Sequence, residues 1–311
     1  MTRAARLVEL GKPLRVEDVG LPEPGPDEVV VDLAFAGVNP VDRYIAEGRL
    51  AADGPLPRTL GSEASGHLGA KPVLAFGAEL GAQRDGIWAE GAVVPRELVY
   101  DLPPGVSLDE AAAMGIAGLT AWNVIGLAEV SAADRVLVLG ASGGVGLPLV
   151  SLAASAGATV RGQTGSESKA AAVRAMGAES VVVTDAGGLA ASAADFRPTV
   201  VIDSLGNGFT AAALSVMAPR GRLVIFGASA GAEGTLKLGE LYRNGHRILG
   251  YAGLRITAEQ RRKGLEAALL ALADGRLRIP IGRVWPLDEV NEALGALAQR
   301  AGTGKTLLRL G

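Results

Sequence analysis

A run of glycines stands directly after an apolar stretch, and this spacing suits a phosphate-binding turn. Residues 136–146 read Val-Leu-Val-Leu-Gly-Ala-Ser-Gly-Gly-Val-Gly. Glycine lets the chain turn tightly and lets the backbone approach a phosphate with no Cβ in the way. The apolar stretch predicts a strand, and 147–156 predicts a helix, whose N-terminus favours negative charge. Because 159–164 predicts a second strand, the pattern indicates a dinucleotide site.

The residues after the second strand favour NADPH over NADH. NAD sites usually place Asp or Glu at the end of that strand, where the carboxylate bonds the ribose 2′-hydroxyl. Here the strand ends Arg161-Gly-Gln-Thr164, without a carboxylate. Ser166 and Lys169 follow, and a hydroxyl and an ammonium group suit a 2′-phosphate. Glu167 leaves an alternative open, since it could bond a ribose hydroxyl if it points inward.

Composition narrows the class of protein. The chain has 311 residues, 49% of them hydrophobic, which is enough for two domains with sizeable cores. A net charge of −3 argues against a nucleic-acid partner. Cysteine is absent, which excludes disulfides, thiolate zinc sites and cysteine nucleophiles. We expect a cytoplasmic protein, because no apolar stretch resembles a signal peptide or a membrane span.

Short strands are expected in the first hundred residues, which Pro and Gly punctuate. The alternating segment 28–35 predicts a strand, as do 72–76 and 92–94. Residues 39–48 predict a short helix with Asn39 as N-cap and Pro40 at its first position. A helix is also expected over 107–114, where Ser107 and Glu110 form a capping box.

From about Gly118, apolar strands alternate with Ala-rich helices. Further strands are expected at 180–184, 200–203, 221–226 and 246–251, which makes six with the first two. Six is the number of strands in a complete doubly wound sheet. The remaining segments predict helices at 257–273 and 287–299 and strands at 281–284 and 306–310. We expect this end to pack back on the N-terminal domain.

An ordered set of motifs resembles a known family. It comprises Gly37-Val-Asn-Pro-Val-Asp42, Leu60-Gly-Ser-Glu-Ala-Ser-Gly66, Gly118-Leu-Thr-Ala121, the Gly140 turn, Asp203-Ser-Leu-Gly206 and Gly221-Arg-Leu-Val-Ile-Phe-Gly227. Together these resemble the medium-chain dehydrogenase/reductase superfamily, in its zinc-free NADPH:quinone oxidoreductase branch. The resemblance covers nearly the whole chain.

The resemblance implies a fold and an activity. The fold is α/β: a GroES-like β-barrel domain at 1–117, completed by 256–311, with a doubly wound parallel Rossmann sheet at 118–255 inserted between its parts. The activity is hydride transfer from NADPH to a small-molecule quinone or activated enone, in a cleft beside the nicotinamide. A homodimer joined through the edge strand near 246–251 is also implied.

Site residues follow from the same resemblance, position by position. Those near substrate or nicotinamide would be Asn39, Tyr44 and Thr120. Those that bind the cofactor would be Gly140, Ser142, Gly143, Gly144, Val145, Gly146, Ser166, Lys169, Ser204, Phe226, Gly227 and Tyr251. No metal is expected, because the zinc-dependent branch has cysteine where Asn39 stands and histidine where Ser62 stands.

Other interpretations of these residues remain open. Asn39 can be only a helix cap, Tyr44 can only pack its helix against the barrel, and Asp203-Ser204 can be an ordinary strand-to-helix cap. His67 and His246 are far apart in sequence, and a metal site at either is not expected. The segment Gly302-Thr-Gly-Lys-Thr306 resembles the end of a P-loop, but Gln299 replaces the leading glycine and no helix can follow.

The substrate is not fixed by the resemblance. The segment between Gly66 and Trp88 is shorter than usual, and Arg49-Leu50 stands where a second cleft tyrosine is common. Without zinc or a histidine acid, a quinone or conjugated enone is favoured over a plain carbonyl, because its negative charge spreads into an enolate. The alternatives are an enoyl-thioester or alkenal reductase of the same superfamily and a non-catalytic NADPH-binding protein.

Overall fold

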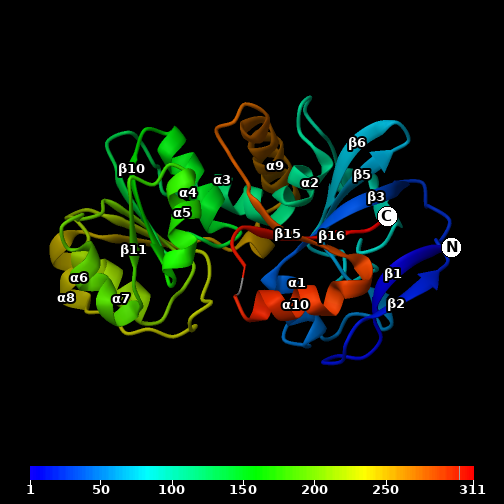
Figure 1. Ribbon diagram of the computed structural model, residues 1–311, viewed down its shortest axis with the longest axis horizontal. Helices are drawn as coiled ribbons and strands as arrows, with labels where there is room; N and C mark the ends of the chain where they lie inside the picture. The colour runs from blue at the N-terminus through cyan, green and yellow to red at the C-terminus, as the bar shows by residue number, and fades with distance from the viewer. Residues whose placement is uncertain (301) are drawn as a thin grey trace. The chain divides into compact units, whose positions relative to one another are not determined.

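The computed structural model describes residues 1–300 and 302–311 and divides into two compact units (Figure 1). The first unit comprises Met1–Gly118, Leu265–Ala273 and Ile279–Gly311, and the second comprises Leu119–Gly264 and Asp274–Arg278. In the described residues, no helix is both long enough and apolar enough to cross a membrane.

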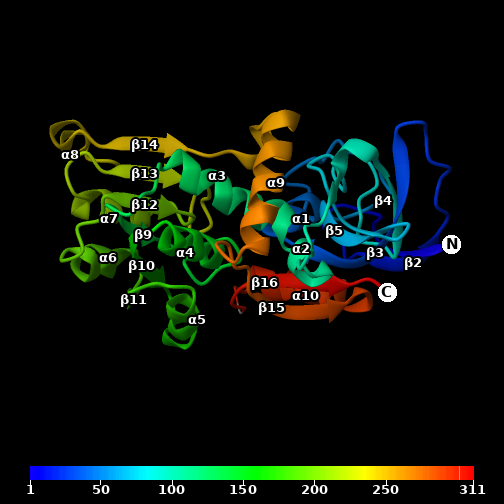
Figure 2. The ribbon, with the colours of Figure 1, turned by 90° about the horizontal axis from the view of Figure 1, so that it is seen from above.

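The second unit is built on a six-stranded parallel sheet, with strand order β11-β10-β9-β12-β13-β14 (Figure 2). This is the order of a doubly wound dinucleotide-binding sheet. The strands are β9 (Arg135–Val138), β10 (Thr159–Thr164), β11 (Ser180–Val183), β12 (Val200–Asp203), β13 (Arg222–Ile225) and β14 (Arg247–Gly250). The expected six parallel strands are confirmed.

The helices between these strands are α4 (Gly146–Ser155), α5 (Ala170–Ala175), α6 (Ala186–Ala193), α7 (Gly208–Val216) and α8 (Leu238–Asn244). Helix α3 (Leu119–Leu127) precedes β9, and α9 (Ala258–Ala273) follows β14 and belongs to the second unit only as far as Gly264. Short 3₁₀ turns lie at η3 (Glu167–Lys169) and η4 (Gly253–Arg255). Most of these strands are largely apolar, as expected where both faces of a parallel sheet are covered. Leu137, Val201 and Leu223 of neighbouring strands are fully buried in one core with residues of α6 and α7.

The first unit contains a three-stranded antiparallel sheet and a larger, mostly antiparallel one. The former has the order β2-β1-β4, and the latter β15-β16-β3-β5-β6-β8 with β7 paired to β3. The strands are β1 (Thr2–Leu7), β2 (Arg15–Val19), β3 (Glu28–Val38), β4 (Arg58–Thr59), β5 (Glu63–Leu68), β6 (Lys71–Phe76), β7 (Gly91–Pro95), β8 (Val99–Asp101), β15 (Ile281–Pro286) and β16 (Lys305–Arg309).

Few helices accompany these sheets: α1 (Pro40–Ala46), α2 (Leu108–Ala112), α10 (Val290–Ala298) and the short turns η1 (Arg96–Leu98) and η5 (Leu287–Glu289). The C-terminal strand β16 pairs antiparallel with β3, from Thr306 opposite Val38 to Arg309 opposite Phe35. The expectation that the chain's end returns to the N-terminal domain is therefore met at this strand pair.

One expected helix differs in the structure. The segment expected to be helical over 107–114 forms α2 and then a π-helix, η2 (Met114–Gly118). The capping box of Ser107 and Glu110 is present, with Glu110 Oε2 accepting from Ser107 N at 3.2 Å. A π-turn replaces the end of the α-helix, and the peptide N–H of Ile116 in that turn donates to Glu63 Oε2 at 2.7 Å. A contact with a residue far along the chain gives no signal in local periodicity.

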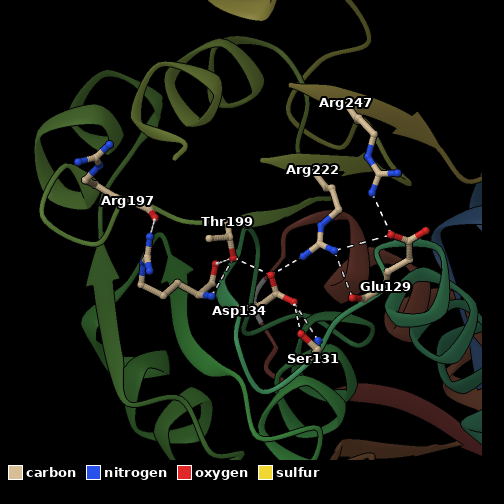
Figure 3. Close-up of polar contacts among 8 residues, drawn as sticks. Glu129, Ser131, Asp134, Arg197, Thr199, Arg222 and Arg247 are labelled. Carbon is tan, nitrogen blue, oxygen red and sulfur yellow. Dashed lines mark hydrogen bonds and ion pairs between the residues drawn. The ribbon is translucent and has the colours of Figure 1, made fainter. Parts of the chain in front are cut away.

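A polar network joins the amino ends of the parallel strands in the second unit (Figure 3). Asp134, just before β9, accepts a hydrogen bond from Thr199 Oγ1 at 2.8 Å and forms an ion pair with Arg222 of β13. Arg247 of β14 donates to Glu129 Oε2 at 2.9 Å. Burial raises the pKa of Asp134, but the hydrogen bonds and Arg222 outweigh it and hold the pKa below its usual range. This network stabilises the end of the sheet opposite the glycine turn.

Candidate functional site

The glycine turn follows β9 and is closed by two residues that admit no side chain. Gly140 has φ +69°, and a Cβ there would lie 2.6 Å from Ser204 Oγ. A Cβ on Gly146, the first residue of α4, would lie 2.3 Å from Gly140 O. The strand, the turn and the start of the helix are therefore packed as closely as the glycines allow. In α4, Leu147 N donates to Gly143 O at 3.1 Å and Pro148 has no N–H, so an anion here would be held by the N–H groups of Gly144, Val145 and Gly146.

A buried glutamine supports this turn from the neighbouring strand. Gln163 of β10 is 2% exposed and accepts a hydrogen bond from Gly140 N at 3.0 Å. Its Nε2 donates to Thr184 O at 2.6 Å. Ser142 of the turn and Thr164 at the end of β10 share a hydroxyl–hydroxyl hydrogen bond of 3.0 Å. The sequence showed Gln163 only as a strand residue that is not acidic, so its supporting role was missed.

The end of β10 presents hydroxyl and ammonium groups. Ser166 has extended backbone and precedes the 3₁₀ turn Glu167–Lys169, and its Oγ lies 2.7 Å from Ser168 Oγ. Lys169 is half-buried at the end of that turn, and Glu167 is exposed. These residues follow the carboxyl end of a parallel strand, the edge at which such sheets bind ligands.

Asp203 and Ser204 hold the turn that follows β12. Asp203 is fully buried, and its Oδ1 accepts from Leu205 N at 2.7 Å and from Gly206 N at 3.0 Å. Its Oδ2 accepts from Thr210 Oγ1 of α7 at 2.6 Å. Ser204 Oγ donates to Leu139 O at 3.0 Å, which links this turn to the one after β9. The strand-to-helix cap considered for this pair is therefore present.

The residues that directly follow β13 and β14 lie at the same carboxyl end of the parallel sheet. Phe226 N donates to Asp203 O at 3.0 Å, and Tyr251 N donates to Ile225 O at 2.9 Å. Gly227 lies against the Ser204 turn, since a Cβ on it would be 2.9 Å from Ser204 O. Five of the expected cofactor positions thus gather with Gly140 at one sheet edge: Ser142, Ser204, Phe226, Gly227 and Tyr251.

Two polar residues of α3 lie at the Tyr251 phenol. Asn123 Nδ2 donates to Tyr251 Oη at 3.1 Å, and the Thr120 hydroxyl lies close enough to lower the pKa of the phenol. Burial raises the pKa of the Tyr251 phenol, and the bonds from Asn123 and Thr120 only partly oppose this rise. Asn123 was not expected in the site. Its spacing of three residues from Thr120 on one helix was the available signal.

In the first unit, a buried ion pair holds the side chain of Asn39. Lys305 Nζ lies 2.7 Å from Glu63 Oε1 and donates to Asn39 Oδ1 at 2.6 Å. Asn39 Nδ2 donates to the same Glu63 oxygen at 2.6 Å. Glu63 is fully buried, and Lys305 and Asn39 are each 3% exposed. The orientation of the Asn39 amide is therefore fixed by both partners.

A second buried carboxyl group, that of Asp42, lies next to Asn39. Asn39 precedes α1, and its backbone N–H donates to Asp42 Oδ2 at 2.8 Å. Burial raises the pKa of Asp42 to about 7; the bond from the Asn39 backbone opposes the rise and nearby Glu63 adds to it. The capping interpretation of Asn39 is confirmed, together with contacts that capping does not require.

Tyr44 has a different environment on the same helix. Arg49 Cζ lies 4.3 Å from the centre of the Tyr44 ring, and Arg43 Cζ lies 5.4 Å from it. Arg49 stands where a second tyrosine was the more usual residue, and its guanidinium covers the ring in a cation–π contact. Asn39 and Tyr44 belong to the first unit, and Thr120 belongs to the second.

Which group the glycine turn and its surroundings suit depends on the side chains and N–H groups that lie there. Among the described residues, no three His, Asp or Glu side chains are grouped so that they could hold a metal ion. In the first unit, Ser62 Oγ is buried without a hydrogen-bond partner. At the glycine turn, the close approach of the backbone and the turn's N–H groups before α4 suit a pyrophosphate. Lys305, in the segment that resembles the end of a P-loop, is buried against Glu63.

Comparisons with known proteins agree with this architecture. Residues 144–270 match the family described as zinc-binding dehydrogenase. The human (Homo sapiens) quinone oxidoreductase is 30% identical over 327 residues, covering 100% of this chain and 98% of that protein. The solved quinone oxidoreductase of Thermus thermophilus, also solved with NADPH, is 28% identical with a TM-score of 0.87, covering 99% of this chain and 100% of that one. A solved NAD-dependent alcohol dehydrogenase is 30% identical with a TM-score of 0.89, covering 99% and 100%.

Proposed function

The chain belongs to the medium-chain dehydrogenase/reductase superfamily, in its quinone oxidoreductase branch, and we propose that it reduces a quinone or another activated enone with NADPH and without catalytic zinc. Bound NADPH supplies the hydride. The protein's residues bind the dinucleotide, orient the acceptor and supply a proton to the reduced acceptor. The first unit would be the GroES-like domain of the family, with the Rossmann unit inserted in its chain.

The residues that follow β10 favour NADPH over NADH. Ser166 and half-buried Lys169 stand where NAD sites carry a carboxylate. A 2′-phosphate bears close to two negative charges, and a hydrogen bond from an ammonium group to it is charge-assisted. Exposed Glu167 is free to turn away from that phosphate. The pyrophosphate would lie at Gly140, Gly143, Gly144 and Gly146, with Val145 at the start of α4.

Two features of the first unit support an acceptor that needs no Lewis acid. The Asn39 amide oxygen accepts from Lys305, and one N–H of its Nδ2 donates to Glu63. The second N–H of Nδ2 remains for another acceptor. Tyr44 offers an aromatic ring backed by Arg49. An amide and an aromatic ring can orient a planar conjugated carbonyl, for which positioning supplies much of the rate.

A homodimer formed through β14 is part of this proposal. This strand ends the parallel sheet, so one of its edges has no partner strand in the described residues. Ile248 and Leu249 are half-buried, and Leu238 and Tyr242 of the preceding helix are each 69% exposed. An open edge beside apolar side chains favours pairing with a second copy.

Replacement of Lys169 tests the cofactor assignment. We expect Lys169→Ala to weaken NADPH binding about 10- to 100-fold, the usual worth of a charge-assisted hydrogen bond, and to leave NADH binding nearly unchanged. Fluorescence titration of both nucleotides measures the effect. Arg174→Ala, which removes an exposed charge from α5, is the matched control and should change neither affinity. Equal losses for NADPH and NADH would contradict the assignment.

A panel of acceptors tests the activity. NADPH oxidation is followed with benzoquinones, naphthoquinones, alkenals and an enoyl thioester. Turnover with quinones or small enones supports the proposal. Turnover confined to the enoyl thioester would make the protein an enoyl-thioester reductase, and binding of NADPH without turnover would make it a non-catalytic nucleotide-binding protein.

A further inference from the structure

Three polar side chains meet in the second unit where the sheet presents its ligand-binding edge. Tyr251 directly follows β14, and Thr120 and Asn123 lie three residues apart on α3. Asn123 Nδ2 donates to the Tyr251 phenol oxygen at 3.1 Å, and the Thr120 hydroxyl lies close enough to lower the pKa of that phenol. Gly264 of α9 leaves room for this arrangement, because a Cβ there would lie 2.9 Å from Asn123 Oδ1.

The arrangement has the form of a proton relay and not only of a packed tyrosine. Asn123 donates through its amide N–H, so the phenol keeps its own proton for a different acceptor. The Thr120 hydroxyl can accept that proton and pass on its own, because a hydroxyl is both donor and acceptor. Two groups that hydrogen-bond the phenol oxygen also stabilise the phenolate left behind.

We propose that Tyr251 is the proton donor of the reduction, that Thr120 passes its proton to the acceptor oxygen, and that Asn123 is a positioning residue that holds the phenol. The inference rests on the proposed function, in which hydride addition brings an electron pair and leaves a negative charge on the acceptor oxygen.

The proton transfer balances within these groups. The Tyr251 O–H bond breaks, its electron pair stays on Oη, and the proton moves to Thr120 Oγ. The proton of Thr120 passes to the acceptor oxygen, which becomes a neutral hydroxyl group. Water then returns a proton to the phenolate. Burial raises the pKa of the Tyr251 phenol, so it holds its proton at neutral pH, and Asn123 and Thr120 oppose this rise and so lower the cost of releasing the proton.

The experiment compares single and double variants of the whole protein. Tyr251→Phe and Thr120→Val each remove one hydroxyl from the relay, and each should lower kcat about 100-fold, within the usual worth of general acid catalysis. Since the two groups act in series, the double variant should lose no more than either single one. Thr120→Ser keeps the hydroxyl and should retain most of the activity. Ser215→Ala, which removes an exposed hydroxyl from α7, is the control.

Measurements independent of turnover separate the relay from a structural role. NADPH dissociation constants should be nearly the same in wild type and Tyr251→Phe. In the protein without nucleotide, ultraviolet titration should show a tyrosine that ionises above the ordinary range and disappears in Tyr251→Phe. Asn123→Leu should move that ionisation to still higher pH.

The outcomes distinguish this inference from the proposed function. If the wild-type protein fails to oxidise NADPH with every acceptor of the panel, both the proposed function and the relay are overturned. An active wild type whose Tyr251→Phe variant has unchanged kcat overturns the relay alone. A Tyr251→Phe variant that loses NADPH affinity and keeps its kcat also overturns the relay, because the phenol would then bind the cofactor and not donate a proton. Additive losses in the double variant would show that the two hydroxyls do not act in series.

Discussion

Asn39 shows how several contacts can fix one side chain. Its backbone N–H donates to Asp42, its amide oxygen accepts from Lys305 and its amide nitrogen donates to Glu63. With both amide atoms committed, Asn39 cannot rotate to suit a ligand without breaking a buried bond. An unmade buried hydrogen bond to a charged group is costly, so this amide is a pre-organised group.

Asp42 makes the stability of the first unit depend on pH in an unusual direction. Burial raises its pKa to about 7 in the folded protein, whereas an unfolded chain has the ordinary value near 3.9. Between these two values the folded state binds more protons than the unfolded one. The contribution of Asp42 to stability is therefore full below about pH 4 and falls as the pH rises towards 7.

The Asp42→Asn variant isolates this contribution. Asparagine can still accept the bond from Asn39 N but carries no titrating group. We expect the variant to gain stability relative to wild type as the pH is raised from 5 to 8. Guanidinium unfolding of both proteins at each pH measures the difference, in which all other titrating groups cancel. A difference that stays constant with pH would contradict the raised pKa.

Residues such as Gln163, Asn123 and the Glu63–Lys305 pair could not be assigned roles from the sequence. Glu63 and Lys305 are separated by 242 positions, and an ion pair over that distance has no periodic signal. Gln163 stands in β10, which reads Thr-Val-Arg-Gly-Gln-Thr, and there the sequence shows only that position 163 is not acidic. The turn glycines were assignable because tight turning restricts residue type at each position, whereas a supporting side chain can come from any neighbouring strand.

At the scale of elements, the agreement was best where periodicity is strong. The strand expected at 159–164 has those bounds, and α9 begins one residue after its expected start. The short strands β1, β2 and β8 were not expected, since each is too brief or too polar to give a period-two pattern. The π-helix η2 was missed because a hydrogen bond to Glu63 competes with regular helix geometry there.

The Glu63–Lys305 pair connects three elements: β5, β16 and the N-terminus of α1. Removal of one charge leaves the other buried and unpaired. We expect Lys305→Met to destabilise the protein by about 3–5 kcal/mol, whereas Lys305→Met with Glu63→Gln should recover much of that loss. Denaturant unfolding at constant pH measures both.

A surface pair supplies the matched control for this experiment. Lys263 and Glu259 of α9 lie 2.7 Å apart with about three quarters of each side chain exposed. Lys263→Met should therefore cost only about 0.3–0.5 kcal/mol. A double variant of the buried pair as unstable as the single one would show that packing, and not the unpaired charge, dominates.

At the scale of the whole molecule, each unit has its own hydrophobic core, and the parallel sheet of the second unit ends in an open edge at β14. In the parallel sheet, β14 leaves one edge without a partner strand among the described residues. Arg247 N and Tyr251 N donate inward to β13, so by alternation the N–H of Gly250 faces outward. The proposed homodimer depends on such outward groups.

Gly250 allows a direct test of that edge, because a Cβ on it would meet nothing within 4 Å. We expect the wild-type protein to sediment as a dimer, Gly250→Ala to remain dimeric, and Gly250→Pro to dissociate, since proline removes the outward donor without removing a bond to β13. Sedimentation equilibrium gives the masses, and NADPH titration verifies that the proline variant retains its nucleotide site. A monomeric wild type would refute the dimer, and a dimeric Gly250→Pro variant would place the contact on another surface.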